Sequence, residues 1–238
     1  MDASQDIFRA YDIRGVYGTE LDAEIGEQIG LVFGNYLRKF NDSGTISIGS
    51  DARASSPELQ TAVSTGISRA GFDVDVIGMV PIPIANYCTW KASLGDDPYI
   101  AGVYITASHN PAEYNGIRFR HPDGAGYTEG NIEIKRMFFE EAAKEHSESG
   151  KINILSTDEK LNDYTNFVMS KMGNLDGMRI AIDPGNGVGS IIIDELFQKF
   201  GVETSCINNV PDGSFPNRPS EPAPKNLGEL ISLARKDN

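Results

Sequence analysis

The sequence reads YIAGVYITASHNP from residue 99 to residue 111, and this stretch decides the fold class. Its first half is a continuous apolar run with the length and composition of a buried strand. Its second half is polar and contains a proline, so the strand runs directly into a loop. Open α/β sheets bind their ligands in loops at the carboxyl ends of strands. We therefore expect the functional site around residues 106–111.

Segments on both sides of this stretch alternate between strand-like and helix-like patterns. We expect strands over residues 45–50, 73–77, 99–106 and 116–120, and helices over 21–40, from 55 onward, 81–93 and 131–144. The alternation predicts an α/β fold in which helices lie on both sides of a mixed sheet.

A polar stretch of small residues at 146–150 predicts a linker or domain edge. We expect one domain over residues 1–147 and a second, of similar topology, over residues 148–238. In the second domain we expect helices over 161–172, 187–200 and 226–236, and strands over 179–183 and 202–207. It stops where a further strand is due, so we expect a truncated, incomplete domain.

The charge balance excludes two classes of partner. The chain has 21 Lys and Arg against 34 Asp and Glu, a net charge of −13, which disfavours nucleic acid and anionic membranes. No apolar run approaches the roughly 20 residues of a spanning helix. The acidic N-terminus does not resemble a secretory signal, so we expect a cytoplasmic location. Cys88 and Cys206 lack metal-type spacing, and we expect them to be reduced.

Ser108 is the candidate nucleophile of the loop after residue 106. A serine hydroxyl needs a neighbouring base, metal or cationic field, and His109 and Asn110 are adjacent candidates. A Gly-x-Ser-x-Gly elbow is excluded, because Thr106 and Asn110 stand where glycines would be. The alternative interpretation is an ordinary turn, since Ser, Asn and Pro are common in turns.

Several arginines lie on or beside the expected loops of this acidic chain: Arg9, Arg14, Arg53, Arg118 and Arg120. Planar guanidinium groups bind phosphate oxygens in pairs, so these residues are suited to hold a phosphorylated group. The alternative is that they are solvated surface charges. Glycines over residues 183–189 resemble a phosphate-binding loop only weakly, and a tight strand-to-helix turn is the alternative interpretation.

Four motifs in order closely resemble the phosphomannomutase/phosphoglucomutase branch of the α-D-phosphohexomutases. They are Phe8–Gly15, Thr106–Pro111 with Tyr114–Gly116, Asp183–Gly187 and Pro211–Asn217. The resemblance covers the whole chain, which corresponds to about the first half of such a four-domain enzyme. It implies an isomerase that moves a phosphoryl group between O1 and O6 of a hexose phosphate through a 1,6-bisphosphate intermediate.

The resemblance also implies roles for individual residues. Ser108 carries the phosphoryl group, and a phosphoserine oxygen is a ligand of Mg²⁺. Arg14 lies near the phosphoserine, and Arg118 belongs to the catalytic set with His109. The substrate and phosphate loops include Tyr11, Asn110 and Arg9. A hexose phosphate is the substrate, and glucose or mannose 1,6-bisphosphate is the activator.

The chain departs from the family pattern at two positions. Arg118 replaces a lysine proposed to transfer protons, and arginine keeps its charge but is practically never deprotonated. Ser50 replaces the first arginine of a Gly-Arg-Asp-x-Arg loop, so one cation is lost. The remaining metal ligands of the family are expected beyond Asn238.

Two functional hypotheses follow from the sequence. The first is a magnesium-dependent phosphohexomutase whose 238 residues do not turn over substrate alone. The alternative is a non-catalytic fragment that binds phosphosugar or another protein. An incomplete second domain would expose apolar surface, and we then expect self-association.

Overall fold

The computed structural model describes residues 3–236. Contacts along the chain divide it into two units, each assembled from several stretches. Unit 1 comprises residues up to 51, 55–107 and 113–157, and unit 2 comprises residues 52–54, 108–112 and those from 158 onward. The domain boundary expected at residues 147 and 148 stays a prediction.

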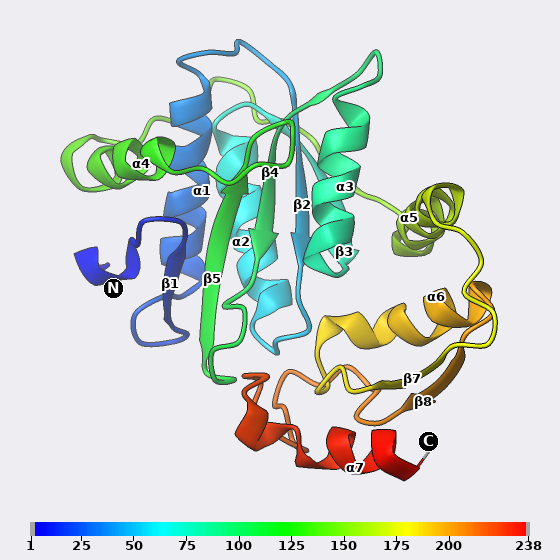
Figure 1. The fold of residues 1–238 in the computed structure, drawn as a ribbon. Coiled ribbons are helices and arrows are strands. Elements are labelled where there is room, and N and C mark those ends of the chain that lie inside the picture. The colour runs from blue at the N-terminus through cyan, green and yellow to red at the C-terminus, as the bar shows by residue number, and fades with distance from the viewer. Residues whose placement is uncertain (1–2, 237–238) are drawn as a thin grey trace. The chain divides into compact units, whose positions relative to one another are not determined.

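Unit 1 contains the larger sheet and its helices (Figure 1). Its strands are β1 (Ile13–Val16), β2 (Thr45–Ser50), β3 (Asp73–Met79), β4 (Tyr99–Ile105), β5 (Tyr114–Arg120) and β6 (Ile152–Ile154). Its α-helices are α1 (Ala23–Leu37), α2 (Ser56–Arg69), α3 (Ile82–Ala92) and α4 (Glu129–Glu140), and a 3₁₀ turn spans Gln5–Ile7.

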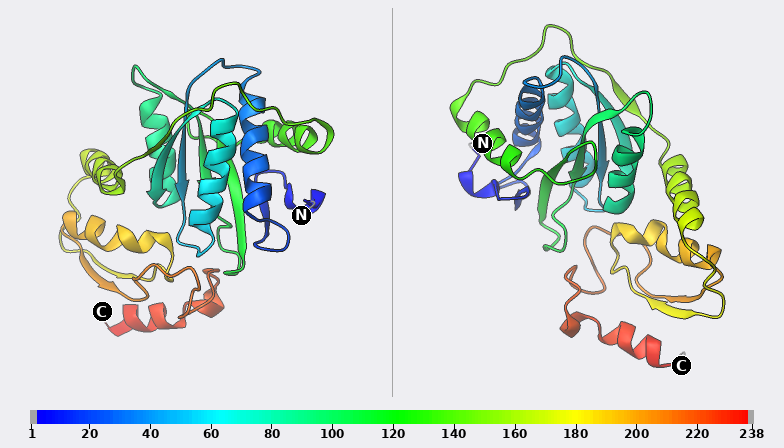
Figure 2. Two further views of the ribbon diagram at one scale, coloured as in Figure 1. Left: turned by 180° about the vertical axis from the view of Figure 1, so that it is seen from behind. Right: turned by 45° about the horizontal axis from the view of Figure 1, so that its top comes forward.

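The six strands lie in the order β1-β5-β4-β2-β3-β6. β2 pairs in parallel with β3 and β4, and β3 pairs in parallel with β6. β5 is antiparallel to both β4 and β1. Helices α1 and α2 cover one face of this sheet and α3 covers the other (Figure 2). The predicted mixed sheet between helices is therefore confirmed.

The core of unit 1 lies between the sheet and the α1–α2 pair. Apolar side chains from both layers form one buried cluster, in which Phe33 of α1 stacks on Phe119 of β5 with ring centroids 3.9 Å apart. Glycines let the two helices approach closely. A Cβ atom at Gly66 of α2 would overlap the Glu27 carbonyl of α1. This tight layer fixes the sheet whose loops carry the functional residues.

The sequence patterns predicted most of unit 1 and missed two strands, β1 and β6. Residues 45–50 form β2 as expected. The expected helix 131–144 begins at Glu129 and ends at Glu140. Residues 146–150 hydrogen-bond to α2, and β6 follows them at the sheet edge. Ile152 and Ile154 are 42% and 77% exposed, so β6 lacks the alternation that marks a half-buried strand.

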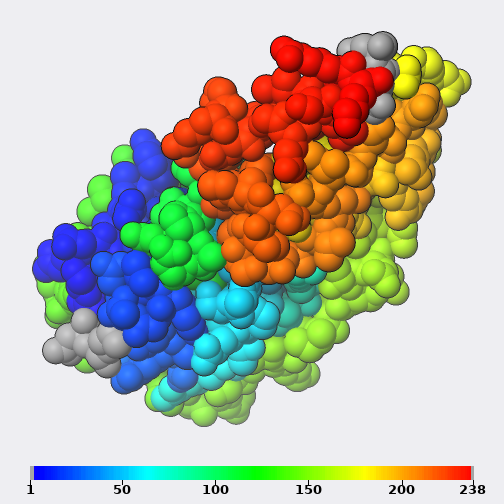
Figure 3. All heavy atoms as spheres, turned by 90° about the horizontal axis from the view of Figure 1, so that it is seen from below, coloured from blue at the N-terminus to red at the C-terminus, as the bar shows by residue number. Residues whose placement is uncertain are grey.

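Unit 2 is built on a two-stranded parallel sheet. Its strands are β7 (Arg179–Ile182) and β8 (Glu203–Cys206), and its helices are α6 (Ile193–Lys199), α7 (Gly228–Lys236) and α5 (Thr157–Lys171), the last beginning in unit 1. 3₁₀ turns span Val188–Ile191 and Pro224–Asn226. α6 packs on β8 and α7 packs on β7. α7 has no buried residue and lies on the surface (red in Figure 3).

The single helix expected over residues 187–200 is wrong in one respect. The segment is a 3₁₀ turn followed by the short helix α6, and Ile192 between them has φ −139°. Glycines at 187 and 189 weaken the first turn, and β-branched isoleucines at 191–193 have low helix propensity.

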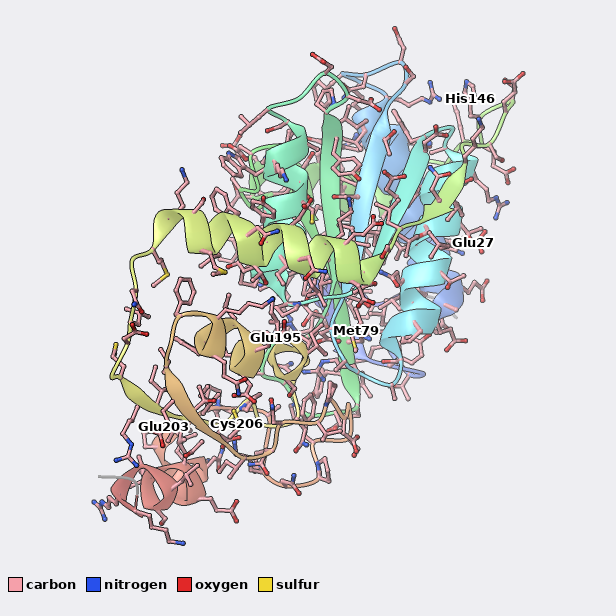
Figure 4. All side chains as sticks on the ribbon, turned by 90° about the vertical axis from the view of Figure 1, so that its right-hand side faces the viewer. Glu27, Met79, His146, Glu195, Glu203 and Cys206 are labelled. Carbon is pink, nitrogen blue, oxygen red and sulfur yellow. The ribbon has the colours of Figure 1, made fainter. Side chains whose placement is uncertain are left out.

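The two cysteines are not paired with each other. Neither forms a disulfide, and Cys88 is buried. Cys206 lies at the end of β8 (Figure 4), where burial and the Asp194 carboxylate raise its pKa to about 11. In residues 3–236, every helix is too short or too polar to cross a bilayer.

Candidate functional site

The serine loop (residues 108–112) follows the carboxyl end of β4. Ser108 and His109 are exposed, and Ser108 has a backbone φ of 59°. This left-handed conformation is uncommon for a residue with a side chain, and it is often found at functional sites. The His109 Nδ1 atom lies 3.4 Å from the Ser108 Oγ atom. The structure therefore presents the expected nucleophile beside its expected partner.

Arg53 is buried and hydrogen-bonds to the backbone of the serine loop. Its side chain is 1% exposed and donates hydrogen bonds to the carbonyl oxygens of Ser108 at 2.9 Å, Asn110 at 2.7 Å and Pro111 at 2.6 Å. The guanidinium also lies 5.3 Å from the centre of the Phe215 ring. A rigid, planar donor thus fixes three backbone carbonyls at once, which sets the path of the loop.

A second segment of unit 2, the supporting loop (residues 211–220), completes this arrangement. The Ser220 hydroxyl donates to the carbonyl of His109 at 2.7 Å and to that of Asn110 at 2.8 Å. A Cβ atom at Gly213 would lie 2.5 Å from the Ala52 oxygen and the Ala54 nitrogen. Only glycine allows this close approach, so the supporting loop packs directly on the backbone beside Arg53.

The stem of the serine loop is fixed within unit 1 by Asp51. Its carboxylate accepts hydrogen bonds from Thr106 at 2.6 Å and from Ser56 at 2.7 Å. The Asp51 amide also donates to the Ile105 carbonyl at 3.0 Å. These bonds tie the ends of β2 and β4 to the start of α2, so the chain leaves β4 in a fixed direction.

Unit 1 brings two of the expected arginines to one carboxylate. The Arg14 Nη2 atom lies 2.5 Å from Asp12 Oδ2, and the Arg118 Nε atom lies 3.5 Å from the same oxygen. Asp12 is 7% exposed. Arg9 and Tyr11, in the turn before Asp12, are exposed.

The glycine-containing segment after β7 is a structural turn. Arg218 Nε lies 2.6 Å from the Asp183 carboxylate, and a Cβ at Gly185 would lie 2.5 Å from the Arg218 guanidinium. Burial raises the pKa of Asp183, but hydrogen bonds from Arg218, Asn208 and Gly185 outweigh it and lower that pKa. Arg218 therefore lies against the turn and is paired with Asp183, which favours the turn interpretation.

The residues present do not by themselves fit a magnesium ion. In the part of the chain that the structure describes, no three His, Cys, Asp or Glu side chains gather at metal-binding distances. Ser108 offers one oxygen, whereas Mg²⁺ takes six ligands with carboxylates among them.

Sequence reasoning singled out Arg53 only as one of several possible phosphate-binding arginines and gave no role to Ser220. The burial of Arg53 and its three carbonyl partners show that it supports the loop. Its position two residues after Asp51, in a loop that follows a buried strand, was a usable signal. Ser220 lies more than a hundred residues from its partners, so no local pattern could have marked it.

Known protein families match both parts of the chain. "Phosphoglucomutase/phosphomannomutase, alpha/beta/alpha domain I" matches residues 5–145, and the corresponding domain II matches residues 161–238. These two matches together cover well over half of the sequence.

Individual relatives agree with these matches. A probable phosphoglucosamine mutase of Methanobrevibacter smithii is 34% identical over 231 residues, covering 96% of this chain and 50% of that protein. Another, from Pyrococcus abyssi, is 36% identical over 229 residues, covering 96% and 48%. The crystal structure of a phosphoglucomutase/phosphomannomutase family protein from Burkholderia thailandensis has a TM-score of 0.89 at 30% identity, covering 99% of this chain and 51% of that one. The chain spans about half the length of these relatives.

Proposed function

Because the chain belongs to the phosphoglucomutase/phosphomannomutase family, we propose that it supplies the phosphoserine part of a phosphohexomutase. Ser108 is the phosphoryl carrier. The substrate is a hexose monophosphate, a class that includes the phosphosugars in the names of the relatives. The net reaction is an isomerisation in which the phosphate moves between O1 and O6.

The proposed chemistry requires two transfers that balance each other. In the first, the Oγ–P bond of phosphorylated Ser108 breaks while a P–O bond forms to the free sugar hydroxyl, whose proton passes to the departing Ser108 Oγ atom. In the second, the other P–O bond of the bisphosphate breaks while a new Oγ–P bond forms to the Ser108 hydroxyl. The Ser108 proton passes to Nδ1 of His109, which lies 3.4 Å from Oγ, and from there to the departing sugar oxygen. Phosphoryl transfer relies mainly on positioning and on charge stabilisation.

The observation that carries the proposal is the conformation of the serine loop. Ser108 stands exposed at φ 59°, while Arg53 and Ser220 fix the carbonyls of the same loop. A serine in a plain surface turn does not need a buried arginine beneath it. The loop is therefore built to hold one hydroxyl in a defined place, as a phosphoryl carrier requires.

Two assays on the purified chain test the proposal. Incubation with glucose 1,6-bisphosphate should add the mass of one phosphoryl group to Ser108, located by peptide mass spectrometry. A coupled assay with mannose 1-phosphate or glucose 1-phosphate and magnesium reports the whole reaction. Ser108→Ala should abolish labelling, while Ser170→Ala, at an exposed serine of α5, should leave it unchanged. Equal labelling of the Ser108→Ala chain would contradict the proposal.

A non-catalytic binding module is the second candidate. It is favoured because residues 3–236 hold the serine without a cluster of carboxylates for a metal. This candidate predicts binding of hexose phosphates with neither labelling of Ser108 nor turnover. Phosphorylation of Ser108 would exclude it.

A further inference from the structure

The strand β5 places two arginines side by side on one face of the sheet. Ile117 and Phe119 point into the core, so the alternate residues Arg118 and Arg120 lie on the opposite face. That face also carries Arg14, because Arg14 on β1 pairs with Gly116 of β5. Three guanidinium groups therefore come from adjacent positions of two paired strands.

The buried carboxylate of Asp12 forms ion pairs with two of these three arginines. Asp12 lies 2.5 Å from Arg14 and 3.5 Å from Arg118. No carboxylate in residues 3–236 lies within ion-pair distance of Arg120, and its buried Nε atom has no hydrogen-bond partner there. Burial, and then repulsion from Arg118, lowers the pKa of Arg120, and Asp12 offsets this only in part. Arginine nevertheless stays protonated in proteins, so Arg120 carries a positive charge that no carboxylate of residues 3–236 pairs with.

The backbone next to Arg120 limits where its guanidinium can go. The residue forms a bridge with Gly126 in the turn after β5, and a Cβ at Gly126 would lie 2.7 Å from Arg120 Nη1. The turn therefore passes directly over the side chain. Ordering of this kind before binding reduces the entropy that an anion would otherwise have to offset.

We propose that Arg14, Arg118 and Arg120 form one phosphate-binding site, in which Arg120 is a ligand that neither the family motifs nor the departures from them assign. The positive charge of Arg120, which no carboxylate of residues 3–236 pairs with, suits an anion such as a phosphate monoester, which carries close to two negative charges at neutral pH. Guanidinium groups also offer paired donors to phosphate oxygens. That the natural ligand is a hexose phosphate rests on the proposed function; the affinity for phosphate does not.

The test measures binding of inorganic phosphate to the whole chain by calorimetry and by ¹⁵N spectra of the arginine Nε–H groups. Arg120→Gln should raise the Kd about tenfold, as expected for loss of a charge-assisted pair. Arg179→Gln, which removes the same charge from an exposed pair with Glu203 in unit 2, should leave it unchanged. Arg120→Lys keeps the positive charge but loses the planar pair of donors. Its Kd for phosphate should lie between those of the parent chain and of Arg120→Gln.

Several results would overturn the proposal. They are an unchanged Kd in Arg120→Gln, an equal rise in Arg179→Gln, and phosphate that shifts neither Arg118 nor Arg120 in the spectra. Circular dichroism of each variant separates lost binding from lost folding, and Arg120→Lys remains informative if Arg120→Gln does not fold. Ser108→Ala separates this site from the proposed reaction. The site is supported if Ser108→Ala binds phosphate as tightly as the parent chain, even where labelling of Ser108 fails.

Discussion

Arg53→Ala should loosen the serine loop and destabilise unit 2. The substitution removes hydrogen bonds to the carbonyls of Ser108, Asn110 and Pro111, at 2.6–2.9 Å, and the contact with the Phe215 ring. Hydrogen bonds from a charged donor contribute about 1.5–3 kcal/mol each. Since one side chain makes all three, the lower end applies, and the expected loss is about 4.5 kcal/mol of unfolding free energy.

Hydrogen exchange followed by mass spectrometry measures how far the serine loop loosens in this variant. The amides of His109, Asn110 and Ala112 should exchange much faster in Arg53→Ala, and urea unfolding monitored by circular dichroism should give the size of the loss. Arg179→Ala is the matched control, because its ion pair with Glu203 is exposed and contributes at most about 1 kcal/mol. If Arg53→Ala cost no more than this control, with unchanged exchange in the loop, the role given to Arg53 would be wrong.

Three further predictions concern other parts of the chain. The lowered pKa of Asp183 stabilises the fold above about pH 4, and this contribution is lost as the pH falls through the folded-state pKa. Asp183→Asn should therefore lose less unfolding free energy than the parent chain between pH 7 and about pH 3, as urea titrations would show. Cys206, with its pKa raised to about 11, should react with iodoacetamide at pH 8 at least about a hundredfold more slowly than in the unfolded chain, as peptide mapping would show. Gly66→Ala should cost about 1–3 kcal/mol by forcing α2 away from the Glu27 carbonyl, whereas Gly173→Ala, which points into open space, should leave the melting temperature nearly unchanged.

The fold could be predicted where hydrophobic periodicity and packing agree. β2 carries five buried residues in succession between clear turn signals, and its predicted bounds are those observed. β6 carries none, so its three residues resemble a loop, and only pairing with β3 makes them a strand. The helix expected over 187–200 fails for the opposite reason. Its apolar spacing continues through Ile192, but the backbone there is not helical.

The candidate site could be predicted only in part, because its chemistry is local and its support is not. Ser108 and His109 are adjacent in the chain, so one motif contains both. Arg53 and Ser220 reach the same loop from segments on either side of it, and hydrogen bonds to backbone carbonyls leave no side-chain pattern to detect. The surroundings of the glycine motif after β7 could not be predicted for a related reason. Arg218, which fills it, is remote in sequence.

The assembly of unit 2 from separate stretches has a consequence for the newly made chain. Ser108 is synthesised more than a hundred residues before Ser220, which donates to the neighbouring carbonyls of its loop. At about 5–20 residues per second, translation leaves this loop without that partner for on the order of 10 s. During that interval the residues of unit 1 can already fold, but the loop is open to chaperones and proteases. The loop around Ser108 can therefore reach its final conformation only near the end of translation of these residues.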